Sequence, residues 1–108
     1  MTNVSRVYKK LVRDKIPEII KADGGKPVTR ILGDEEYLIA LIEKLKEELA
    51  EFAAEFSAEE LADIQEVVHA LRDAIGKTYE ELETIRTKKV AANGAFKDKI
   101  FLEAVKNG

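Results

Sequence analysis

The sequence predicts an all-α fold, an antiparallel helical bundle completed by homo-oligomerisation. Composition is the first reason: 45% of the 108 residues are hydrophobic and 36% are charged, with six glycines, two prolines and no tryptophan, a profile typical of helical proteins. Apolar residues also recur every three or four positions along two long stretches, and capping residues precede each stretch. At this length we expect one domain, residues 1–108, small enough that association would help to stabilise it.

The first helix is predicted after an extended start to the chain. Asp14 is a candidate N-cap for a short helix that runs to about Ala22, with Pro17 tolerated in its first turn and Gly24-Gly25 ending it. The segment 26–32 is rich in β-branched residues and lacks a helical period. It is therefore expected to be an extended connection or a short edge strand.

Two long helices follow, and each has a wide apolar face. Asp34 is the predicted N-cap of the first one, whose apolar residues are Leu38, Leu41, Ile42, Leu45, Leu49, Phe52 and Phe56. Ser57 with Glu60 is a capping-box pattern that opens the second one, which ends at Gly76. Its predicted core face consists of Leu61, Ile64, Val67, Val68, Leu71 and Ile75. The short connections at Ser57 and Gly76 predict antiparallel neighbours.

A further helix is predicted near the carboxyl end of the sequence. Thr78 and Glu81 repeat the capping-box pattern and open a helix to about Ala92. Asn93-Gly94 is its predicted stop, and a short amphipathic tail, residues 96–105, follows.

Two acidic pairs are the most informative functional signal. Glu48 and Glu51 stand three residues apart on one predicted helix, and Glu60 and Asp63 stand three apart on the next. Residues three apart share a helix face, so four carboxylates converge if the helices lie side by side. Two like charges about 4 Å apart repel by roughly 4 kcal/mol at an effective dielectric near 20, a large part of the about 5–15 kcal/mol that stabilises a domain. A cluster of oxygen ligands without histidine or thiol predicts a hard cation, Mg²⁺ or Mn²⁺.

Helical phase separates these acids from the many others in the chain. Glu48 falls on the border of the apolar stripe and Glu51 one step further out, while Glu60 falls inside the apolar arc of its helix with Asp63 at the margin. A carboxylate on a core-facing arc costs free energy unless it is paired or binds a metal ion. The alternative is that Glu60 only completes the capping box with Ser57 and that the other acids form a solvated surface.

Charge distribution and cysteine content limit the possible partners. The net charge of −3 is uneven, because the first 15 residues are basic and residues 43–66 are mainly acidic. Duplex nucleic acid is not expected to bind a net acidic domain, whereas a small polyanion fits the basic start. Zero cysteines exclude disulfides and a thiolate zinc site, and with no long apolar run we expect a cytoplasmic protein without membrane contact.

Several segments resemble the all-α nucleoside triphosphate pyrophosphohydrolase superfamily, which includes MazG-like proteins, dimeric dUTPases and phosphoribosyl-ATP pyrophosphohydrolase. KLKEELAEF followed by EELADIQEVVHAL carries the superfamily pattern. YKKLVRDKIPEII and KKVAANGAFKDKIFL resemble the opening and closing segments of the phosphoribosyl-ATP pyrophosphohydrolase-like branch. Two features depart from the family: only eight residues separate Glu51 from Glu60, and Asn93-Gly94-Ala95-Phe96 stands where Arg-Gly-Gly-Phe is common.

The resemblance implies a site and a reaction. Its metal motifs coincide with Glu48/Glu51 and Glu60/Asp63, which would hold one or more Mg²⁺ ions. The implied activity is hydrolysis of a nucleoside triphosphate to a nucleoside monophosphate and pyrophosphate in a homodimer or homotetramer, with Glu47 or Glu51 orienting or deprotonating the water. Candidate phosphate contacts are Arg13, Lys15, Lys89 and Lys97.

Other functions remain open from the sequence. Phosphoribosyl-ATP hydrolysis in histidine synthesis uses the same metal chemistry and differs only in the base and ribose pocket. A non-enzymatic helical interaction module, antitoxin-like or an adaptor, would use its acidic stripe only to stay in solution. Each basic residue also has a structural alternative, since cations in the last turn of a helix are favoured by its dipole and the N-terminal ones can simply pair with acidic helices.

Overall fold

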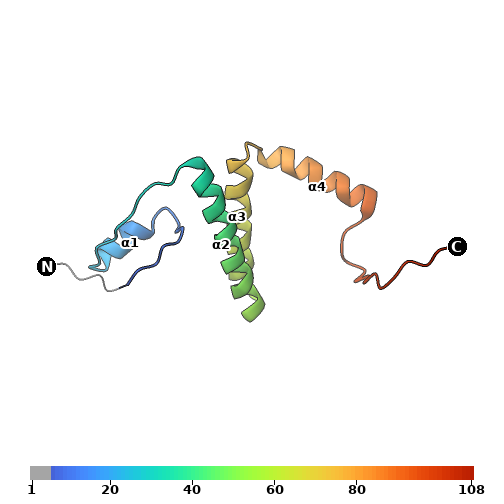
Figure 1. Cartoon of the computed structure of the whole chain (residues 1–108), viewed down its shortest axis with the longest axis horizontal. Coiled ribbons are helices and arrows are strands. Elements are labelled where there is room, and N and C mark those ends of the chain that lie inside the picture. The colour runs from blue at the N-terminus through green and yellow to red at the C-terminus, as the bar shows by residue number, and fades with distance from the viewer. Residues whose placement is uncertain (1–5) are drawn as a thin grey trace. The chain divides into compact units, whose positions relative to one another are not determined.

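A computed structural model describes residues 6–108, which contain four helices and no strand (Figure 1). The helices are α1 (Ile16–Ala22), α2 (Asp34–Ala54), α3 (Ala58–Ala74) and α4 (Tyr79–Asn93). The chain divides into a first unit that ends at Gly76 and a second unit that begins at Lys77. The prediction of an all-helical chain is confirmed, and the segment 26–32 is a connection rather than an edge strand.

The two predicted aspartate caps are wrong by one position. Lys15 occupies the N-cap of α1 and Gly33 that of α2, and neither helix start has a side-chain cap. Asp34 is instead the first residue of α2, where its negative charge is still favoured by the helix dipole. Pro17 lies in the first turn of α1, as predicted, because that turn needs no N–H donor there.

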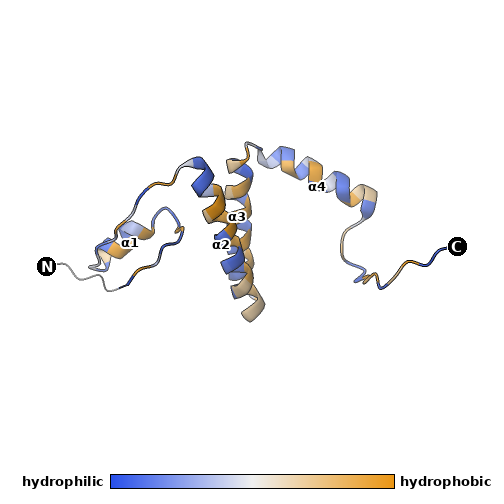
Figure 2. Cartoon of the chain, in the orientation of Figure 1, coloured by the Kyte–Doolittle hydropathy of each residue, from blue (hydrophilic) through white to orange (hydrophobic). Residues whose placement is uncertain are grey.

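Helices α2 and α3 form an antiparallel hairpin joined by residues 55–57 (Figure 1). Leu41 of α2 and Val67 of α3 are the buried hydrophobic residues of the described chain, with 2% and 7% of their surface exposed. Half-buried residues extend this seam: Leu38, Leu45, Phe52, Ile64 and Leu71. Polar and apolar residues alternate around both helices (Figure 2), as amphipathic packing requires.

Half of the predicted core face of the hairpin is exposed, which corrects the sequence prediction. The exposed apolar face consists of Ile42 and Leu49 on α2, Leu61 and Val68 on α3, and Phe56 and Ile75 just after the ends of these helices. The two residues on each helix stand seven apart, so they line up along the axis beside the seam. Because residues advance in opposite senses around antiparallel helices, both rows fall on the same side of the hairpin. The apolar stripe is therefore wide enough for the seam and for a second contact.

The second unit contains α4 and the residues that follow it. Thr78 and Glu81 form the predicted capping box: the Thr78 hydroxyl accepts from the Glu81 N–H at 3.1 Å, and the Glu81 carboxylate accepts from the Thr78 N–H at 3.0 Å. Gly94 ends the helix with a φ of +87°, a conformation that favours glycine. The tail, residues 96–105, has no helix.

Across residues 6–108, no helix is both long enough and apolar enough to cross a membrane.

Candidate metal centre

Three carboxylates of the hairpin converge at the α2–α3 seam. One oxygen atom each from Glu48, Glu60 and Asp63 lies within 4.8 Å of the other two. Glu48 projects from the seam side of α2, and Glu60 and Asp63 project from the first two turns of α3, three residues apart. We call these three residues the acidic cluster. Three of the four carboxylates predicted to converge therefore do so in the structure, and Glu51 is not in this group.

Glu48 is the most constrained member of the acidic cluster. Only 6% of its surface is exposed, and its Oε2 atom has no hydrogen-bond partner among residues 6–108. The Oε2 atom of half-buried Glu60 is also buried without a partner. Burial raises the pKa of Glu48, and the charges of Glu51 and Asp63 raise it further against the opposing effect of Lys44. Buried carboxylate oxygens without partners are costly, and a bound cation would satisfy them.

The side chain of Glu60 does not complete a capping box. The Ser57 hydroxyl accepts from the Glu60 N–H at 3.2 Å, which is half of the motif. The Ser57 N–H, however, donates to the carbonyl of Glu55 at 2.8 Å instead of to the Glu60 carboxylate. The alternative that Glu60 serves only as a capping residue is therefore wrong, and its carboxylate is left for the acidic cluster.

This division of roles predicts different effects of two substitutions. Ser57→Ala removes the cap and is expected to lower the free energy of unfolding by about 1 kcal/mol. Glu60→Gln keeps the cap and is expected to show no such loss. Urea titrations monitored by circular dichroism compare the two variants. An equal loss of stability in Glu60→Gln would show that this carboxylate supports the cap after all.

The two candidate catalytic acids lie in different surroundings. Glu51 is exposed one turn beyond Glu48, close enough for its charge to raise the pKa of that residue. Glu47 accepts from Lys10 at 3.3 Å and from Lys44 at 3.5 Å. Burial opposes the charge of Glu47, but the Lys10 hydrogen bond and the charges of Lys44 and Lys10 outweigh it, so its pKa is lowered. A carboxylate engaged by two cations is a weak base, and this difference favours Glu51.

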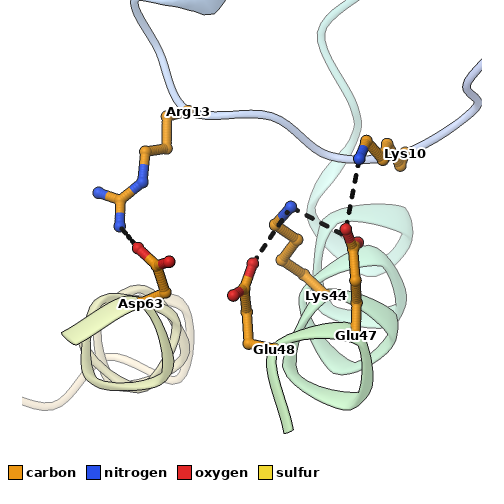
Figure 3. A network of polar contacts seen from close by, with 6 residues as sticks. All are labelled: Lys10, Arg13, Lys44, Glu47, Glu48 and Asp63. Atoms are coloured by element: carbon orange, nitrogen blue, oxygen red, sulfur yellow. Dashed lines mark hydrogen bonds and ion pairs between the residues drawn. The ribbon is translucent and has the colours of Figure 1, made fainter. Parts of the chain in front are cut away.

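Basic side chains pair with two members of the acidic cluster and with Glu47 (Figure 3). Arg13 donates from Nη2 to Oδ1 of Asp63 at 2.6 Å, across 50 residues of sequence. Lys44 lies 3.5 Å from Oε1 of Glu48 and has only 19% of its side chain exposed. With Lys10 on Glu47, these contacts hold the N-terminal segment, residues 6–15, against the hairpin. Cations thus partly offset the repulsion between the acids.

The other predicted phosphate contacts are Lys15 in the first unit and two lysines in the second. Lys15 is exposed at the start of α1, and among residues 6–108 no ion pair joins it to the acidic cluster. Lys89 lies in α4 and Lys97 follows it, both exposed within the second unit. A part for these three residues in phosphate binding stays a prediction.

Sequence reasoning missed Lys44 and Lys10 as partners of the site. Lys44 precedes Glu48 by four residues, a spacing at which opposite charges on a helix meet, so a search for such pairs would have found it. The contact of Lys10 has no comparable signal, because it depends on where an extended segment crosses the hairpin.

Comparisons with known proteins give little further information. No model of a known protein family matches the chain, and no solved structure matches it. A protein of Mycolicibacterium smegmatis described only as uncharacterised is 60% identical over 38 residues. That match covers 35% of this chain and 39% of the other protein. The match thus spans well under half of either chain.

Proposed function

We propose that the protein hydrolyses a nucleoside triphosphate to a nucleoside monophosphate and pyrophosphate. The reaction depends on Mg²⁺, for which Mn²⁺ can substitute. In this proposal the protein is a member of the all-α pyrophosphohydrolase superfamily that its motifs resemble. The observation that carries the proposal is the buried Oε2 atom of Glu48, unpartnered and beside the carboxylates of Glu60 and Asp63. An acidic stripe that only kept a helical module in solution would place its oxygens in water.

The donor set of the acidic cluster fits a hard divalent cation. Carboxylate oxygens from Glu48, Glu60 and Asp63 are ligands that Mg²⁺ and Mn²⁺ prefer. The sequence motif adds Glu51, whose charge raises the pKa of Glu48. When bound, such an ion supplies positive charge that withdraws electrons from the phosphorus and stabilises the leaving oxygen. Residues of the chain itself activate the water and contact the phosphates.

Glu51 is the residue assigned to the attacking water. Its exposed carboxylate is able to accept a hydrogen bond from water and then a proton. The water oxygen forms a bond to the α-phosphorus while the bond from that phosphorus to the bridging oxygen of pyrophosphate breaks. Arg13, which pairs with Asp63 of the cluster, is assigned to the phosphate oxygens. Lys15, Lys89 and Lys97 are assigned the same role from the sequence.

Association of two or four copies accompanies this function in the proposal. The exposed apolar face of the hairpin is the contact surface, because two residues at seven-residue spacing on each of two antiparallel helices match the pattern of a four-helix bundle. Glu51, Lys44 and Glu47 lie on the other side of α2 from this face by helical phase. A second hairpin would therefore cover the apolar rows and leave the acidic side accessible.

The proposed activity is tested with a panel of nucleoside triphosphates that includes dUTP, dCTP and oxidised or deaminated forms. Pyrophosphate release is measured with Mg²⁺ and again with excess chelator. We expect release from at least one substrate and its loss on chelation. Turnover of phosphoribosyl-ATP alone would assign the histidine-synthesis reaction, which uses the same site. Absence of turnover throughout, together with calorimetry showing no metal-linked nucleotide binding, would leave an interaction module.

A further inference from the structure

Arg13 pairs with Asp63, a member of the acidic cluster, and the proposed function gives this ion pair no role. Asp63 belongs to the acidic cluster, yet its Oδ1 accepts a hydrogen bond from the guanidinium of Arg13 at 2.6 Å. Arg13 comes from the N-terminal segment, and the pair is exposed, with 56% of the Arg13 side chain and 37% of the Asp63 side chain accessible. A monovalent cation from elsewhere in the chain thus occupies one oxygen of the cluster.

The relative strengths of the Arg13 ion pair and of divalent-ion binding decide which cation holds Asp63. An exposed ion pair changes an equilibrium constant by only a small factor, at most about five-fold. A divalent ion carries twice the charge of a guanidinium and meets several carboxylates at once, including the buried, unpartnered oxygen of Glu48. The gain from that oxygen exceeds what the Arg13 pair contributes.

We infer that Arg13 is an internal competitor of the metal: its guanidinium neutralises Asp63 in the metal-free protein and leaves when a divalent cation binds the acidic cluster. The inference rests on the proposed metal site and adds a coupling to it. When Arg13 leaves Asp63, its positive charge becomes available to the phosphates of an incoming substrate. It also removes one of the two ion pairs, Arg13–Asp63 and Lys10–Glu47, that join residues 6–15 to the hairpin.

The affinity test compares Mn²⁺ binding by calorimetry in the full chain and its variants. Arg13→Gln removes the competitor, so it should bind Mn²⁺ about two- to five-fold more tightly, the factor that corresponds to an exposed ion pair. Lys10→Gln carries the same change in net charge and also loosens the N-terminal segment, but Lys10 pairs with Glu47 outside the acidic cluster. Lys10→Gln should therefore change the Mn²⁺ affinity by less than Arg13→Gln does. Arg30→Gln breaks an exposed ion pair with Glu36, which has the same 2.6 Å length but lies away from the cluster. This variant should leave the Mn²⁺ affinity unchanged.

A second readout follows the segment itself. Amide hydrogen exchange in residues 7–15 should become faster when Mn²⁺ is added to the unmodified protein, while exchange near Arg30 should not change. The inference is overturned if Arg13→Gln binds Mn²⁺ no more tightly than Lys10→Gln, or if Mn²⁺ slows exchange in residues 7–15. Those results, with tight Mn²⁺ binding intact in the unmodified protein, would leave the proposed function standing. Binding of Mn²⁺ no tighter than in Glu48→Gln would instead overturn both.

Discussion

Glu48→Gln is expected to weaken Mn²⁺ and Mg²⁺ binding by at least about 100-fold, because loss of a ligand exceeds the 10–100-fold that loss of a second-shell partner brings. Pyrophosphate release should fall in parallel. Glutamine has the shape of glutamate but lacks the negative charge, so the helices should stay packed. Calorimetry with Mn²⁺ measures the affinity, and circular dichroism checks the fold.

The same substitution is expected to stabilise the metal-free protein. Burial and the neighbouring acids raise the pKa of Glu48, which means that the folded state disfavours its charge. The folded state then binds more protons than the unfolded state between the ordinary glutamate pKa and the raised value, and stability falls as the pH rises through this window. Removing the charge should raise the free energy of unfolding at pH 7 by about 0.5–2 kcal/mol, the usual gain when a strained functional site is relaxed.

Glu43→Gln is the matched control for Glu48→Gln. Glu43 lies on the same helix, but it is exposed and pairs only with Lys46, whose side chain is equally exposed. This variant should keep both the metal affinity and the stability of the unmodified protein. Tight Mn²⁺ binding that survived in Glu48→Gln would remove the acidic cluster as the metal site, and a clear loss of stability would show that Glu48 is held by favourable contacts.

Leu61→Lys is expected to convert the associated protein into a monomer. Leu61 has 54% of its surface exposed and belongs to the exposed apolar face. Burying one leucine contributes about 1.5–3 kcal/mol, and a two-fold interface contains the residue twice. A loss of about 3–6 kcal/mol raises the dissociation constant by roughly 10²- to 10⁴-fold. Sedimentation equilibrium over a range of protein concentrations measures the change.

Ala62→Lys is the control for this second substitution. Ala62 is exposed on α3 and stands neither three nor four residues from Leu61 or Val68, so it lies off the exposed apolar face. An added lysine there carries the same change in net charge and should leave association as it is. If the unmodified protein sediments as a monomer at every concentration, the exposed apolar face has another partner. If Leu61→Lys associates as well as Ala62→Lys does, the contact between copies lies elsewhere.

Local signals in the sequence predicted the helices well. Periodic leucines predicted α2 and α3 within about two residues at each end, because a seam of this kind needs apolar side chains every three or four positions. The capping box at Thr78 was correct because both of its bonds are local. The caps at Asp14 and Asp34 were wrong because each residue is also acceptable in or beside a first helical turn, and the sequence does not separate the two positions.

The site was predictable only in part. Spacing and phase brought Glu48, Glu60 and Asp63 together, because those features depend on helix geometry alone. Phase did not indicate that Glu48 would be the buried member, since burial depends on how closely the two helices pack. The contacts of Lys10 and Arg13 depend on the path of an extended segment, for which no periodic rule exists.

The acidic cluster draws its donors from two helices that are joined only by residues 55–57 and an apolar seam. An ion bound there acts as a clip between the helices, and its binding energy adds to the resistance of the hairpin to heat. At 100 times the dissociation constant this addition is about 2.7 kcal/mol. For a hairpin with so small a buried interior, magnesium in the surrounding medium would set the melting temperature as much as the leucines do.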